Sequence, residues 1–308
     1  MQIQWYPGHM TKTKRMLQSQ LGVVDMVIEL LDARVPLSSK NPDIDELAQH
    51  KQRLLVLNKA DLADKAVSAQ WEAYFRRLGF FTLCLDSTQR ASVRPLADRV
   101  REIMQPHTDK QRQRGRISAP IRAMVVGIPN VGKSTFINQL AGKASAATAD
   151  RPGVTRGRQW IKVRDMQARG AFDAADFDLM DTPGVLWPKF EDEQVGIRLA
   201  VTGAISDLIL DRITLAEHLL GMLTEINPVS IVARYRITVD NQGELKTPRQ
   251  LLEEVGDVRG FKMKGGVIDL ERTAITLLDE FRAGKLGRIS LERPEEDSQL
   301  QQASIPIE

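Results

Sequence analysis

The chain of 308 residues is 42% hydrophobic and 27% charged, and its 43 basic and 40 acidic residues give a formal net charge of +3. This balance is that of a globular protein and excludes wholesale disorder, and the single Cys84 excludes a disulfide framework or a thiolate zinc site within one chain. No run of about 18 uncharged apolar residues and no secretory signal is present, so we expect a cytoplasmic protein that makes no contact with a membrane.

Short apolar runs alternate with helical patterns through the first two-thirds of the chain. In chain order, strands are predicted at 23–31, 53–57, 80–85, 121–126, 160–163 and 177–180, and helices at 66–78, 93–104 and 134–140. This alternation is typical of βαβ units and predicts an α/β domain over 1–190, with a mostly parallel sheet and helices on both faces. The domain includes an N-terminal segment, 1–20, and a polar, basic stretch bounded by prolines, which predicts a linker over 106–120.

The pattern becomes helical after residue 190 and predicts a small all-α domain over 191–290. Its helices are expected at 193–204, 215–226 and 270–281, with a further one that begins at a Thr247-Pro248 capping box and is closed by Gly256. Residues 291–308 hold five acids and one base, which predicts a disordered acidic tail. Bases gather at 109–122 and 150–169, which suits a phosphate-rich partner or solvated basic loops equally well.

The sequence GIPNVGKS at 127–134 fits the pattern GxxxxGK[ST] between a predicted strand and a predicted helix. Glycines let backbone N–H groups point at phosphate oxygens, and the helix N-terminus favours an anion. Lys133 is expected to reach the β- and γ-phosphates, and the Ser134 hydroxyl is expected to ligate Mg²⁺. The other expected nucleotide contacts in this loop are Asn130, Val131, Gly132 and Thr135. The alternative is a chance glycine-rich turn.

Two further motifs follow predicted strands. After the strand at 177–180, Asp181 of DTPG is expected to hold Mg²⁺, and the N–H of Gly184 to bond the γ-phosphate. After the strand at 53–57, NKAD offers the Asp61 carboxylate to the N1–H and amino group of guanine, a pair of donors that adenine lacks. The remaining contacts expected here are Asn58, which ties this loop to the phosphate loop, the Lys59 stem along the base, and Ser87 after the next strand.

The order of these motifs is unusual, because NKAD comes 69 residues before the first glycine of the phosphate loop. A parallel sheet can be cut and rejoined at a surface connection without moving its site. With this order, WYPGHM at 5–10, DARVPLSSKNP at 32–42, RPGVTR at 151–156 and DTPGVLWPKFED at 181–192, the chain resembles the circularly permuted GTPases of the ribosome biogenesis GTPase A (RbgA/YlqF) family. The resemblance covers nearly the whole chain, although 167–176 is longer than the short hairpin expected.

The resemblance implies roles that the pattern alone does not give. Val185 follows DTPG where Ras-like GTPases use a glutamine to orient water, and the resemblance implies that His9 does this work instead, the alternative being a helix cap. Thr155 is the switch residue expected to close on Mg²⁺ and the γ-phosphate. Asn130 resembles the asparagine that holds K⁺ in potassium-activated GTPases, and a turn-stabilising role is equally open.

The family implies a Mg²⁺-dependent GTP hydrolase that is monomeric when free and docks on the precursor of the large (50S) ribosomal subunit, its rRNA and proteins, which stimulate hydrolysis. Cations near loops of the second domain suit rRNA phosphates; they are Arg259, Lys262, Lys264, Arg272, Arg282, Lys285 and Arg288. Two alternatives remain: an RNA-binding switch that binds GTP with negligible turnover, and a P-loop kinase of metabolism.

Overall fold

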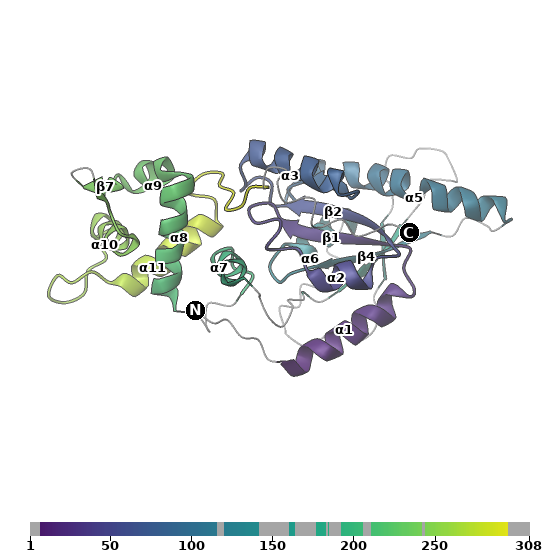
Figure 1. Ribbon diagram of the computed structural model, residues 1–308, viewed down its shortest axis with the longest axis horizontal. Coiled ribbons are helices and arrows are strands. Elements are labelled where there is room, and N and C mark those ends of the chain that lie inside the picture. Colours follow the sequence, from purple (N-terminus) through teal and green to yellow (C-terminus); the bar gives the residue numbers. More distant parts are fainter. Residues whose placement is uncertain are drawn as a thin grey trace.

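The computed structural model describes residues 7–115, 120–141, 160–163, 177–182, 184, 192–205, 211–241 and 244–294, with the backbone alone for 7–13 and 241. Within these ranges a six-stranded sheet lies at one end of the molecule and a group of helices at the other (Figure 1). The strands are β1 Met26–Asp32, β2 Gln52–Asn58, β3 Phe81–Cys84, β4 Ile121–Gly127, β5 Trp160–Val163 and β6 Phe177–Asp181. Each overlaps a strand that the sequence predicts.

The strands lie in the order β3-β2-β1-β4-β6-β5, and all neighbours are parallel except β5 and β6. β1, near the middle, is buried along its whole length, as expected for a parallel strand covered on both faces. The predicted α/β class with a mostly parallel sheet is thereby confirmed. Although β2 precedes β4 by a long stretch of chain, only β1 separates the two strands in space.

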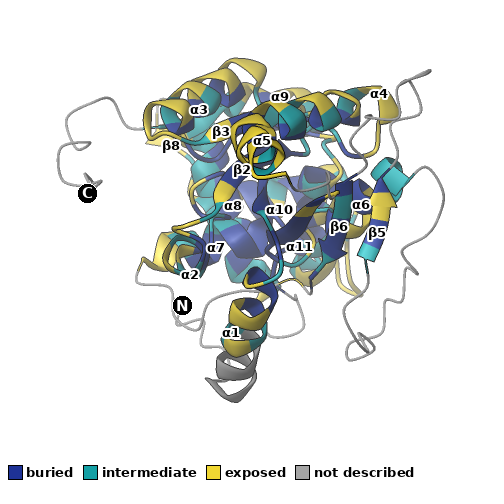
Figure 2. Cartoon of the chain, turned by 90° about the vertical axis from the view of Figure 1, so that its right-hand side faces the viewer, coloured by how far each residue is buried: buried dark blue, intermediate teal, exposed yellow. Residues whose placement is uncertain are grey.

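Helices cover both faces of the sheet. They are α1 Pro7–Leu21, α2 Pro42–Leu47, α3 Lys65–Arg77, α4 Arg90–Val93, α5 Pro95–Gln113 and α6 Lys133–Ala141. On one face, α5 and α6 share an apolar cluster with Ile28 and Leu30 of β1. Val27 and Leu31 point to the other face, where they pack in the clusters of α1, α2 and α3. Figure 2 shows the buried strands between helices with exposed outer surfaces.

Helix α5 is longer than predicted and takes the place of most of the expected linker. Leu96, Val100 and Ile103 bury one side of its first turns. The polar residues that follow include good helix formers, and the helix continues through Pro106 and extends beyond the sheet (Figure 1). The prediction of a linker over 106–120 is therefore wrong for 106–113.

The second group of helices is α7 Glu193–Val201, α8 Arg212–Ile226, α9 Pro228–Tyr235, α10 Pro248–Val258 and α11 Leu270–Arg282. α8 contacts the other four helices and buries Leu215, Leu219 and Leu223 completely. The domain predicted as all-α also carries a two-stranded antiparallel ribbon, β7 Asp240–Asn241 and β8 Glu244–Leu245.

Gly256 does not end α10, contrary to the prediction. The helix begins at the predicted capping box of Thr247 and Gln250, and it continues past Gly256 to Val258. A Cβ atom at Gly256 would lie 2.4 Å from Cγ2 of Ile268. The glycine therefore lets the segment before α11 pack directly against the helix.

The segment after α11, drawn in yellow in Figure 1, returns to the sheet. Leu291 and Glu292 are only 4% and 8% exposed, so the predicted disordered tail does not begin at residue 291. Its acids after residue 294 lie outside the described residues. In the described part of the chain, every helix is too short or too polar to cross a bilayer.

Candidate functional site

The three predicted motifs leave the sheet at one edge. Asn58 ends β2, Gly127 ends β4 and Asp181 ends β6. Because these strands are parallel, their carboxyl ends share an edge, and ligands of open α/β sheets bind outside it. Asp32, at the end of β1, lies between them in register with Asn58.

The side chain of Asn58 joins three loops. Its Nδ2 donates to the carbonyl oxygen of Val131 at 2.7 Å, and its Oδ1 accepts from the backbone N–H of Ser87 at 3.0 Å. Asn58 is fully buried, so both ends of its amide are satisfied away from water. The NKAD loop, the phosphate loop and the loop after β3 are thereby in direct contact.

The phosphate loop makes a close turn against Asn58. Gly132 has a φ of +101°, and a Cβ atom there would lie 2.5 Å from Nδ2 of Asn58. This backbone conformation and this contact both require glycine. The loop then enters α6 at Lys133, and Ser134 and Thr135 are exposed in the first turn, where a helix N-terminus favours anions.

Lys133 lies inside the loop rather than in solvent. Its ammonium group donates to the carbonyl oxygens of Gly127 at 3.0 Å and Ile128 at 2.8 Å. Burial lowers the pKa of Lys133 to about 8, and the nearby Asp181 carboxylate acts in the opposite direction. Keeping Lys133 charged in the loop therefore costs free energy, and an anionic ligand would reduce that cost.

The DTPG stretch approaches the phosphate loop closely. A Cβ atom at Gly184 would lie 2.8 Å from Cα of Pro129 and 2.9 Å from Nζ of Lys133. Thr182 anchors the stretch to β4, because its hydroxyl donates to the carbonyl oxygen of Val125 at 2.6 Å. Burial raises the pKa of Asp181, against the effect of Lys133.

The remainder of NKAD is shaped by its neighbours. Lys59 has a φ of +60°, and its Nζ lies 3.1 Å from Oδ2 of Asp32. Asp61 is exposed. Partial burial and Asp86 raise the pKa of the Asp61 carboxyl, whereas Arg288 acts in the opposite direction. The base-reading carboxylate proposed from the sequence thus stands at an open position beside the segment that returns from α11.

Asn130, at the tip of the phosphate loop, reaches the turn after α7. Its φ is +57°, and its Nδ2 donates to the carbonyl oxygen of Gly203 at 2.8 Å. This contact joins the phosphate loop to the turn after α7, and it tests neither the turn-stabilising nor the cation-binding role of Asn130.

Several predicted residues lie outside what the structure describes. For His9 it gives the backbone, within α1. Thr155, Val185 and the segment 167–176 lie outside the described residues. Their roles stay predictions.

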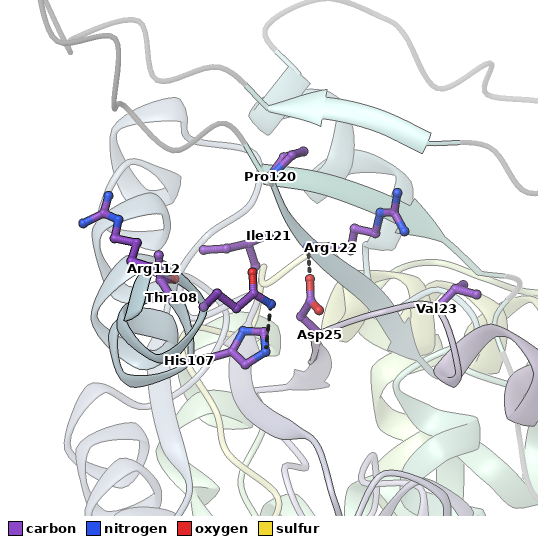
Figure 3. A pocket seen from close by; sticks show the side chains of 9 residues that line it. Val23, Asp25, His107, Thr108, Arg112, Pro120, Ile121 and Arg122 are labelled. Atoms are coloured by element: carbon purple, nitrogen blue, oxygen red, sulfur yellow. Dashed lines mark hydrogen bonds between the residues drawn. The ribbon is translucent and has the colours of Figure 1, made fainter. Parts of the chain in front are cut away.

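A cavity of about 180 Å³ lies at the opposite edge of the sheet. Asp25, just before β1, and Arg122, at the start of β4, line it together with His107 of α5 (Figure 3). Asp25 accepts a hydrogen bond from the backbone N–H of Arg122 at 2.8 Å. Because this edge holds the amino ends of the parallel strands, the cavity is separate from the motif loops.

Sequence reasoning missed Asp32 and Arg34 as site neighbours. Arg34 forms a bidentate ion pair with Asp32, donating from Nε at 2.9 Å and from Nη2 at 2.8 Å. A signal was available, because Asp32 directly follows an apolar strand, as Asn58 and Asp181 do.

Comparison with known proteins identifies the relatives of this chain. Residues 122–237 match the family model described as 50S ribosome-binding GTPase. The chain is 44% identical to ribosome biogenesis GTPase A of Bacillus cereus over 296 residues, which are 96% of this chain and 95% of that protein. It is 33% identical to mouse mitochondrial ribosome-associated GTPase 1, over 94% of this chain and 90% of that protein.

A solved structure shares the fold. The crystal structure of GNP-bound YlqF from T. maritima superposes with a TM-score of 0.64 at 24% identity, over 92% of this chain and 99% of that one. The extent of identity with the curated relatives, together with the permuted order of the motifs, decides the family. The chain belongs to the ribosome biogenesis GTPase A family, and it is a GTP hydrolase.

Proposed function

We propose that this GTPase binds GTP with Mg²⁺ and acts in maturation of the large (50S) ribosomal subunit. It works as a monomer in the bacterial cytoplasm. The rRNA and proteins of the subunit precursor stimulate its hydrolysis of GTP. The names of its relatives and of its family support the ribosomal partner. The observation that carries the nucleotide site is the bridge from Asn58 to Val131 and Ser87. A metabolic kinase does not agree with membership of this family.

Asp61 selects the base in this proposal. Its carboxylate accepts from the N1–H and the amino group of guanine, and adenine would leave it desolvated and unpaired. Sites built on such a donor pair reject the wrong ligand by roughly 10⁴–10⁵. Ser87 adds a backbone contact to the base, and Arg288 favours the ionised form of Asp61 that this binding requires.

The phosphates occupy the loop around Lys133. Phosphate oxygens are stronger acceptors than the carbonyl oxygens of Gly127 and Ile128, which its ammonium group contacts. Among the residues described, no three His, Cys, Asp or Glu side chains gather as metal ligands. Mg²⁺ needs only one or two protein oxygens beside water and phosphate, so the Ser134 hydroxyl and the Asp181 carboxylate suit it. When bound, the ion neutralises charge on the phosphates.

Three residues complete the proposal from the family resemblance. His9 orients the attacking water, since an imidazole can accept its proton near neutral pH. Thr155 closes on Mg²⁺ and the γ-phosphate. Asn130 contributes its side-chain oxygen to a K⁺ ion while its Nδ2 holds Gly203.

The proposal is tested by single-turnover GTP hydrolysis with and without 50S precursors. We expect precursors to raise the rate of GTP hydrolysis by the wild-type protein. The stimulated rate of His9→Ala is expected to be lower by about 10²–10⁴-fold. His50→Ala, a change at an exposed histidine, is the control and is expected to behave as the wild type. Equal, negligible rates in all samples would favour the RNA-binding switch without turnover.

Sedimentation tests the partner separately. With a non-hydrolysable GTP analogue, the protein is expected to migrate with 50S precursors from cell lysate, and with GDP it is expected to stay in the soluble fractions. Soluble migration in both nucleotide states would contradict the ribosomal role.

A further inference from the structure

Asp32 belongs to the stretch 32–42, which carries the family resemblance and has no role in the proposed function. It ends β1 in register with Asn58 of β2, and it is 2% exposed. Its Oδ2 lies 3.1 Å from the Nζ of Lys59. A buried carboxylate is therefore paired with the second residue of the NKAD motif.

The Asp32 carboxylate has a fixed orientation. Arg34 donates to Oδ1 from Nε at 2.9 Å and to Oδ2 from Nη2 at 2.8 Å, a planar two-point contact. The backbone N–H of Asp32 donates to Oγ of Ser39 at 2.9 Å. Burial opposes the charged form, but Arg34 and Lys59 together hold the pKa of Asp32 well below its usual range. The carboxylate that faces Lys59 is thus ionised at neutral pH.

Arg34 is itself held from the helical side of the molecule. Its guanidinium carbon lies 5.4 Å from the centre of the Phe281 ring of α11. Its carbonyl oxygen accepts from the backbone N–H of Leu291 at 2.8 Å. These contacts come from residues far along the chain and keep the Asp32–Arg34 pair in place.

Lys59 is a residue that needs such support. Its φ of +60° is sparsely populated for a residue with a side chain. Its four-carbon stem is flexible, and ordering such a side chain upon binding reduces affinity. An ion pair to a fixed carboxylate orders the stem before the ligand arrives.

We infer that Asp32 is a positioning residue for guanine binding: it holds the ammonium group of Lys59, and so sets the lysine stem along the face of the base. This inference rests on the proposed base site. Asp32 acts through Lys59 and does not itself touch the nucleotide.

A double-mutant cycle tests the inference through the dissociation constant of a fluorescent GDP analogue. Asp32→Asn and Lys59→Met are each expected to weaken binding about three- to tenfold. The double variant is expected to bind no more weakly than Lys59→Met, because Asp32 has no other route to the base. The KM for GTP is expected to rise in Asp32→Asn and in the double variant by about the same factor as in Lys59→Met. The denaturation midpoint of each variant, measured beside it, reports any general loss of structure.

Asp45→Asn is the matched control, since it removes a carboxylate paired with Lys40 and Arg53 elsewhere on the sheet domain, and it is expected to leave GDP affinity unchanged. If Asp32→Asn does not fold, Asp32→Asn/Arg34→Met removes both buried charges together and serves in its place. Wild-type affinity of these variants, or additive losses in the cycle, would overturn the inference.

Asp61→Asn, measured beside them, separates this inference from the proposed function. If Asp61→Asn changes its preference from GTP to xanthosine triphosphate while Asp32→Asn keeps the wild-type affinity for GDP, the positioning role alone is overturned. If Asp61→Asn keeps its preference for GTP, the proposed base site is overturned, and the positioning role of Asp32 is overturned with it.

Discussion

At the scale of single residues, Lys133 illustrates how a phosphate site is charged before its ligand binds. Lys133 is 8% exposed, and its ammonium group donates to two loop carbonyl oxygens. Burying a charged lysine costs free energy, and here only carbonyl dipoles and Asp181 offset that cost. Phosphate oxygens would offset it more fully. The buried lysine therefore lowers the stability of the nucleotide-free protein and raises its affinity for phosphate.

The pH dependence of unfolding should report this cost. The pKa of Lys133 is about 8 in the folded protein against 10.5 as the ordinary value, so the unfolded state binds the proton more tightly. Below about pH 8 the cost is complete, and it fades as the pH rises toward 10.5. We expect the free energy of unfolding of the nucleotide-free protein to rise by about 3 kcal/mol over this window, relative to Lys133→Met.

Urea denaturation of both proteins across this pH range measures the difference, in which titrating groups remote from Lys133 cancel. Curves that run parallel from pH about 7 to about 10 would show that Lys133 carries no such cost in the folded protein.

At the scale of elements, the segment that returns from α11 fastens the helical domain to the sheet. The Glu292 carboxylate accepts from the backbone N–H groups of Leu37 and Ser38 and from the Ser38 hydroxyl. Its carbonyl oxygen accepts from Nε1 of Trp71 at 3.2 Å. Nearby, the backbone N–H of Ile289 donates to the carbonyl oxygen of Leu62, just after NKAD. The same short segment therefore supports both the loop after β1 and the loop after β2.

Removal of the Glu292 carboxylate should loosen this attachment. Glu292→Ala leaves the buried N–H of Ser38 and the partly buried N–H of Leu37 without an acceptor, so we expect it to lower the free energy of unfolding by about 1–3 kcal/mol. Glu253→Ala, which removes a half-exposed partner of Arg249 on α10, is expected to cost only about 0.3–0.5 kcal/mol. Chemical denaturation compares the two, and equal losses would contradict an anchoring role for Glu292.

The elements that could be predicted from the sequence are those specified by nearby residues. Strands such as 121–126 follow from short apolar runs, and the phosphate loop follows from its own spacing. The length of α5 was missed for a local reason, since its second half has helix-forming residues but no apolar periodicity. The burial of Glu292 could not be predicted, because Glu292 is stabilised by residues about 250 positions away. The ion pair of Asp32 with Lys59 was missed for the same reason, since it requires the register of β1 against β2.

At the scale of the whole molecule, the permuted order of the motifs leaves the site intact because the sheet is assembled by adjacency in space. β2 and β4 flank β1, and β6 lies beside β4. The loops of NKAD, the phosphate loop and DTPG therefore meet at one edge, and Asn58 and Gly184 make the contacts between them. The helical domain contacts the same edge through Gly203 and the segment after α11.

The measurement that tests the account most directly is the nucleotide preference of Asp61→Asn. An asparagine amide can donate to the additional carbonyl of xanthine, whereas it repels the amino group of guanine. We expect the variant to lose about 10²-fold or more in GTP affinity and to gain affinity for xanthosine triphosphate. Asp64→Asn, which changes the cap of α3 three residues further on, is expected to keep the preference for GTP. An Asp61→Asn protein that still prefers GTP would contradict the convergence of these loops on a guanine nucleotide.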